Sequence, residues 1–152
     1  MPVTGRLTLL VKYPGNPQLY TQTTNYVNQP KVFRISEMYL IAAEAAANRQ
    51  GQESIASYYL NELKSKRIAG WYERDYSGQA LVKEIRDERV RELFGEGQRL
   101  FDLKRWHIGF QRSAGQNPAL MQPGANYVSC MRPADDPFFL WPIPTDEVQA
   151  NP

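Results

Sequence analysis

Residues 34–70 read RISEMYLIAAEAAANRQGQESIASYYLNELKSKRIAG, and this stretch predicts two helices that meet at Gly51. Apolar residues recur at helical spacing on both sides of that glycine, and Gly51 and Gly70 stand where the two helices should end. Two helices with almost no connection between them must pack antiparallel, as a helical hairpin. The pair is close in length to the tetratricopeptide repeat of roughly 34 residues.

Prolines lie on both sides of this hairpin, but residues 31–117 contain none. A long proline-free zone favours helices. We therefore expect a third helix from Ser77, its N-cap, to about Phe94 and a fourth over residues 98–108. Four helices make only two hairpins, fewer than the roughly three repeats that a helical array needs to stand alone, which predicts missing neighbours.

The predicted fold is mostly α, with tetratricopeptide-like antiparallel helix hairpins between irregular, loop-rich N- and C-terminal segments. At the ends we expect a short strand near Leu7–Tyr13, a buried extended segment at Phe138–Trp141 and a last helical turn capped by Thr145. Three parts follow: residues 1–33 are a strand and loop lead-in from a missing N-terminal part, 34–109 are the helical core, and 110–152 are a long loop and a proline-rich terminal segment that packs on the helices.

Composition narrows the classes of function. The 152 residues include 18 basic and 16 acidic side chains, a net charge of +2, which gives no strong attraction to nucleic acid. No apolar stretch is long enough for a transmembrane helix, and residues 1–5 show no signal-peptide pattern. Cys130 is the single cysteine, so neither an intrachain disulfide nor a multi-cysteine metal site is expected.

Two charges are expected in the interior. Residues 38–47 are apolar except for Glu44, and a helix that is hydrophobic all round is buried. Arg89 continues the apolar stripe of the third helix. An unpaired buried carboxylate is costly, so we expect a structural buried ion pair between Glu44 and Arg89 or, failing that, between Glu44 and Arg99.

Residues 83–105 mix seven basic with six acidic side chains, which is typical of an ion-paired helix surface. A carboxylate surrounded by arginines is a poor general acid, so this pattern argues against glycoside hydrolysis. His107 has no partners at zinc-ligand spacing, and one His with one Cys is weak support for a catalytic dyad. We therefore predict no catalytic residue, no metal site and no cofactor. The carboxylates weighed for catalysis are Glu88, Glu92, Glu96 and Asp102.

Three blocks of sequence resemble the SusD/RagB family. Gly95 stands where the family usually has Phe or Tyr, and residues 61–70 are two residues longer than the common family version. Both departures affect packing more than assignment. The blocks, in the family's order, are FRISEMYLIAAEA at residues 33–45, ERVRELFGEGQRLFDLKRW at 88–106 and WPIPTDEVQANP at 141–152.

The resemblance implies the C-terminal portion of a lipid-anchored, non-catalytic nutrient-binding protein on the extracellular face of a bacterial outer membrane. It further implies two partners, an oligosaccharide or other nutrient and a SusC-like TonB-dependent transporter that imports it. Cys130 is not the lipidated cysteine, which belongs at the mature N-terminus. A tetratricopeptide-type scaffold for protein–protein contacts is the alternative, although such an array needs neither the long loop nor the terminal Pro-Ile-Pro block.

The three blocks supply no ligand-binding residue, so the binding candidates come from the loop after the second helix. Trp71, Tyr72 and Tyr76 lie in this polar segment, and sugar rings stack on exposed Trp and Tyr. The structural alternative is that these rings cover the end of the hairpin.

Overall fold

The computed structural model describes residues 12–21, 28, 30–111, 131–140 and 143–150. Most of the regular structure is helical, which confirms the predicted fold class. The chain divides into two compact units, residues 1–96 and 97–152. The three-part division expected from the sequence stays a prediction.

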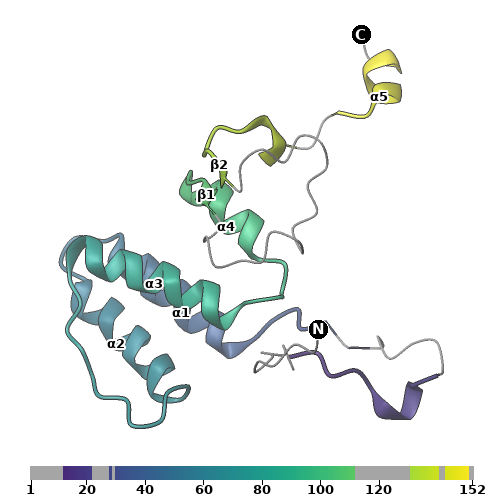
Figure 1. The fold of residues 1–152 in the computed structure, drawn as a ribbon. Helices are drawn as coiled ribbons and strands as arrows, with labels where there is room; N and C mark the ends of the chain where they lie inside the picture. The colour runs from purple at the N-terminus through teal and green to yellow at the C-terminus, as the bar shows by residue number, and fades with distance from the viewer. Residues whose placement is uncertain (1–11, 22–27, 29, 112–130, 141–142, 151–152) are drawn as a thin grey trace, which may run out of the picture. The chain divides into compact units, whose positions relative to one another are not determined.

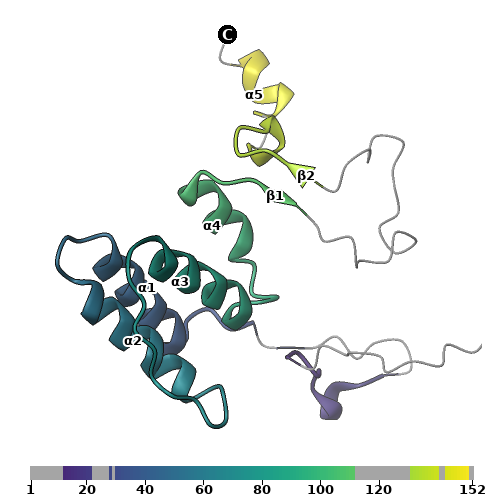
Figure 2. The same ribbon diagram turned by 60° about the vertical axis from the view of Figure 1, so that its left-hand side comes forward.

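Among the described residues of the first unit, three α-helices lie side by side (Figures 1 and 2). An ion pair joins Arg34, at the start of the first helix, to Glu92, at the end of the third, so these two helices are antiparallel. A hydrogen bond joins the start of the third helix to the start of the second: the Gly78 N–H donates to a Glu53 side-chain oxygen at 3.2 Å. The second and third helices are therefore parallel. The three are α1 (Ile35–Ala47), α2 (Glu53–Ser65) and α3 (Gly78–Glu92).

The core lies where the three helices meet. Leu40 and Leu60 are fully buried, and Leu81 and Ile85 of α3 are 1% exposed. Small side chains fill the remaining core positions of α1 and α2, which lets the backbones approach closely. The three helices predicted for this part of the chain are thus present, and the third begins after Ser77 as expected. The small residues are Ala43, Ala46 and Ala56.

The connection between α2 and α3 runs back along α2, because α3 must begin beside the start of α2. Polar side chains of α2 fix this return. Ser57 Oγ donates to the Arg74 carbonyl at 3.1 Å, and Asn61 Nδ2 donates to the same carbonyl at 2.9 Å. Asn61 Oδ1 accepts from the Trp71 indole N–H at 3.2 Å. These bonds hold the predicted ligand loop against the helix.

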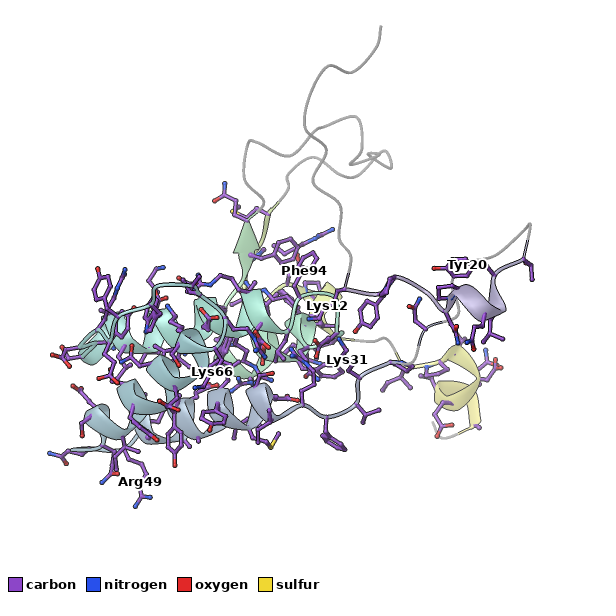
Figure 3. All side chains as sticks on the ribbon, turned by 90° about the horizontal axis from the view of Figure 1, so that it is seen from below. Lys12, Tyr20, Lys31, Arg49, Lys66 and Phe94 are labelled. Carbon is purple, nitrogen blue, oxygen red and sulfur yellow. The ribbon has the colours of Figure 1, made fainter. Side chains whose placement is uncertain are left out.

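The described part of the lead-in also contacts the helices. Lys12 Nζ donates to the Phe94 carbonyl at 2.9 Å, and Figure 3 labels the two residues close together. A 3-10 turn follows at η1 (Pro17–Leu19). The strand predicted near Leu7–Tyr13 falls largely outside the described residues, and the described residues Lys12 and Tyr13 form a bend.

The second unit begins with α4 (Arg99–Trp106), which ends at His107 in the left-handed conformation, φ 50°. Two short strands pair antiparallel, with Phe110 opposite Arg132. Gly109 approaches the Arg132 carbonyl so closely that any Cβ would collide with it. The strands are β1 (Phe110–Gln111) and β2 (Met131–Arg132), followed by η2 (Pro137–Phe139) and α5 (Thr145–Ala150).

Two expectations for this unit need correction. The ends of the segment expected to be a loop from Phe110 to Asp136 pair as β1 and β2, and residues 112–130 lie outside the described part. The segment expected to be extended from Phe138 contains the 3-10 turn η2, in which Pro137 starts the turn and Phe139 is 9% exposed, while Leu140 is 67% exposed. The last helical turn begins at Thr145, as predicted.

A third correction concerns α1. Its composition predicts burial on all sides, but among the described residues of the first unit the covered face of α1 is the one toward α2 and α3. Ile35 is 73% exposed, Met38 42% and Ile41 47%. Three helices cannot surround one of their own members, so one side of α1 remains bare.

Candidate functional site

An ion-pair cluster joins the start of α1 to the end of α3. Arg34 contacts Glu92 at 2.7 Å and Glu96 at 2.9 Å. Arg67, just after α2, holds both oxygens of Glu92 at 2.9 Å. Lys12 of the lead-in pairs with Glu96. The cluster therefore ties four separate segments of the first unit together.

The electrostatics of this cluster favour ionised carboxylates. Burial alone would raise the pKa of Glu92, but hydrogen bonds from Arg67 and Arg34 outweigh it and lower the pKa from 4.5 to about 2. Burial also acts to raise the pKa of Glu96, but the hydrogen bonds and charges of Lys12 and Arg34 outweigh it, so the pKa is lowered. Carboxyl groups whose pKa is lowered in this way hold no proton to donate near neutral pH.

A second cluster lies between α2 and α3. Lys64 is 3% exposed, pairs with Glu84 and lies 3.7 Å from Glu88. Arg91 contacts Glu84 at 2.9 Å and Glu88 at 2.8 Å. Burial would raise the pKa of Glu84, but the hydrogen bond and charge of Lys64, then Arg91, lower it. In the second unit Asp102 pairs with Arg105 at 3.0 Å, so each carboxylate weighed for catalysis has a basic partner.

Arg89 is 5% exposed and pairs with Glu37 of α1 at 3.1 Å. Sequence reasoning missed Glu37 because it considered only the apolar run that begins one residue later. Glu37 and Glu44 are seven residues apart and so lie on the same face of α1. This spacing could have identified Glu37 as a second candidate partner for Arg89. Glu44 is half-buried, and Arg99 is exposed on α4. The pairing of Glu44 with Arg89, or with Arg99, stays a prediction.

The predicted ligand loop brings its aromatic rings together. Trp71 and Tyr72 lie nearly parallel, with centroids 6.3 Å apart and 17° between the planes. The Arg74 guanidinium lies 4.9 Å from the Trp71 centroid and 4.8 Å from that of Tyr72. Lys64 Nζ lies 4.9 Å from Trp71 and 5.6 Å from Tyr76. Sequence reasoning did not foresee that the basic side chains would lie over the rings.

The three rings differ in how much of their surface is exposed to a ligand. Tyr72 is 67% exposed. Trp71 is half-buried and hydrogen-bonded to Asn61, and Tyr76 packs against the core of the first unit. Tyr72 is therefore the ring with the most surface to offer a ligand, while Trp71 and Tyr76 also anchor the loop.

The described residues also bear on metal sites and membrane spans. They contain no group of three His, Cys, Asp or Glu side chains placed to hold a metal ion. No helix among them has the length and apolar character needed to cross a membrane. His107 is exposed at the end of α4, and Cys130 lies outside the described residues.

Comparisons with a protein family model and with a curated protein point to the same family. The SusD family model matches residues 4–152. A SusD-like protein from Formosa agariphila is 32% identical over 131 residues, which cover 84% of this chain and 23% of that protein. The chain therefore spans less than a quarter of the length of this relative. No solved structure shows a significant match.

Proposed function

The chain belongs to the SusD family, and we propose that it forms part of a protein that captures an oligosaccharide or other nutrient at the bacterial cell surface without cleaving it. The family match over residues 4–152 is the observation that carries this proposal. The paired carboxylates support the non-catalytic part, since an acid held ionised by arginine cannot protonate a glycosidic oxygen efficiently.

The wider setting follows from the same membership. We propose that these residues are the C-terminal portion of a longer protein, since the matched relative is about four times the length of the aligned stretch. That protein would be lipid-anchored on the extracellular face of the outer membrane through a cysteine outside this chain. It would deliver its ligand to a SusC-like TonB-dependent transporter.

Within this chain we assign ligand contact to the loop that carries Trp71, Tyr72 and Tyr76. Tyr72 would stack on the apolar face of a sugar ring, because its own ring is exposed and its loop is tied to α2 by hydrogen bonds. Arg74 lies over the Tyr72 ring and can donate to a sugar hydroxyl. Trp71 and Tyr76 would mainly hold this arrangement in place.

Tyr72→Ala in the intact gene product is expected to weaken glycan binding by about 10-fold, because it removes the stacking surface and leaves the buried anchors unchanged. Isothermal titration with the glycan that the wild-type protein binds would measure the change, and far-ultraviolet circular dichroism would check the fold. Phe101→Ala is the matched control, since Phe101 is 66% exposed on α4. Equal affinities for wild type and Tyr72→Ala would remove the loop from the binding surface.

A further inference from the structure

Arg74 differs from the bases of the two ion-pair clusters in having no anion beside it. Its guanidinium lies over the Trp71 and Tyr72 rings, 4.9 Å and 4.8 Å from their centroids. The residue is exposed, and no carboxylate among the described residues lies within ion-pair distance of the guanidinium. Lys64, on the same Trp71 ring, is 3% exposed and pairs with Glu84. Arg74 is therefore the base beside these rings that can still bind an anion.

Arg74 is also held in place at both ends. Its carbonyl accepts hydrogen bonds from Ser57 Oγ and Asn61 Nδ2, and its own N–H donates to Asn61 Oδ1 at 3.2 Å. The two aromatic rings hold the guanidinium at the far end of the side chain. A long side chain that is already ordered loses less conformational entropy when it binds a ligand, which favours tight recognition.

The contact with the rings leaves the hydrogen-bond donors of Arg74 available. A guanidinium stacks on an aromatic ring through its flat face, while its N–H groups point outward from its edge. Two parallel N–H groups match two oxygens of one carboxylate or sulfate group. A sugar hydroxyl offers one oxygen, so it uses less of this donor set. The geometry of the guanidinium therefore suits an anionic group better than a hydroxyl.

The surrounding charges make Arg74 itself the source of any selectivity. Glu73 and Asp75 flank it in the chain and are exposed. They repel an approaching anion through water and salt, which weaken the repulsion, whereas a bidentate contact with the guanidinium is direct. The net charge of the whole chain, +2, gives no general attraction to polyanions.

We propose that the ligand of this loop is an anionic glycan. Tyr72 stacks on a sugar ring, and Arg74 binds a carboxylate or sulfate group on that sugar or on its neighbour. This inference rests on the proposed function and adds the chemical class of the glycan. Uronic acids and sulfated sugars share the required chemistry, since both place negatively charged oxygens beside an apolar ring face.

A titration of the intact gene product with two groups of glycans would test the inference. Starch, xylan and galactan are the neutral group, and glucuronoxylan, pectin and carrageenan are the anionic group. We expect an anionic glycan to bind most tightly. Reduction of its carboxyl groups, or removal of its sulfate groups, should weaken binding at least about 10-fold, and the treatment that does so distinguishes a uronic acid from a sulfated sugar.

Arg74→Gln should weaken binding of the anionic glycan at least about 10-fold and change binding of its neutral derivative less than about 2-fold. Arg49→Gln is the matched control, because it removes the same charge from an exposed arginine between α1 and α2, labelled in Figure 3. The control should bind as wild type does. Circular dichroism would check that both variants fold, and the comparison of glycans on the wild-type protein needs no variant.

Three results would overturn this inference and leave the proposed function standing. The first is tightest binding of a neutral glycan. The second is an equal loss of affinity for the anionic glycan and its neutral derivative in Arg74→Gln, as expected if Arg74 only supports the loop. The third is an equal loss in Arg74→Gln and Arg49→Gln. Binding of no glycan at all would refute the proposed function, and this inference with it.

Discussion

Glu92→Gln is expected to lower the free energy of unfolding by about 3 kcal/mol near neutral pH, because it leaves two arginines without their shared anion. The Glu92 side chain is 9% exposed and lies between Arg34 and Arg67. Its loss removes one ion pair between Arg34 and the end of α3, where the pair with Glu96 remains, and the ion pair that joins Arg67 to the end of α3. Urea unfolding of the 152-residue chain, followed by circular dichroism, would measure the change.

The size of this effect should depend on pH. The pKa of Glu92 in the folded protein, about 2, lies below its ordinary value of 4.5. Ionised Glu92 therefore stabilises the fold fully above about pH 4.5, and this contribution is lost as the pH falls toward 2. The difference between wild type and Glu92→Gln should shrink over that interval.

Asp87→Asn is the matched control, because it makes the same carboxylate-to-amide change on the exposed side of α3. Asp87 pairs with Lys83 at 2.5 Å in water, where a single pair contributes little, so no measurable loss is expected. The account of the cluster fails if both variants lose the same stability. It also fails if the Glu92→Gln deficit is unchanged at low pH.

Arg89→Ala is expected to cost about 3–5 kcal/mol, the second large effect, because Arg89 is 5% exposed and its loss leaves Glu37 in the interior without this partner. The predicted pairing of Glu44 with Arg89 adds a further expectation. In a double-mutant cycle, Glu44→Gln and Arg89→Ala should deviate from additivity by about 1–3 kcal/mol.

The cycle contains its own controls. Glu37→Gln with Arg89→Ala is the positive control, since those side chains are 3.1 Å apart. Glu44→Gln with Arg99→Ala tests the alternative partner. Additivity of Glu44 and Arg89 within about 0.5 kcal/mol would contradict the first pairing, and strong coupling of Glu44 to Arg99 would replace it with the second.

Local sequence signals predicted the helices well. Gly51 separates α1 from α2. The apolar spacing in α2 includes its buried residues Ala56, Leu60 and Leu63, but it also includes Ile55, which is 44% exposed, and Tyr59, which is half-buried. These features depend on neighbours in the chain. The burial of α1 was overestimated because its composition shows only how apolar the helix is. How much of the helix is buried depends on how many other segments pack against it, which its own residues do not show.

The candidate site was predicted less completely, for the same reason. The aromatic loop was found from its residues alone, since Trp71 and Tyr72 are adjacent in a polar segment. The position of Lys64 beside Trp71 could not be foreseen, because it requires the loop to return along α2. The contact of Lys12 with Phe94 joins residues 82 positions apart, and no local pattern signals it.

We propose that this SusD-family chain serves in the capture of a nutrient and not in its cleavage. The most direct measurement is to incubate the intact gene product with a panel of glycans, following bound ligand by equilibrium dialysis and released sugar by chromatography of the same samples. We expect saturable binding of at least one glycan, recovered at its original length. Release of shorter sugars by the purified protein would contradict it.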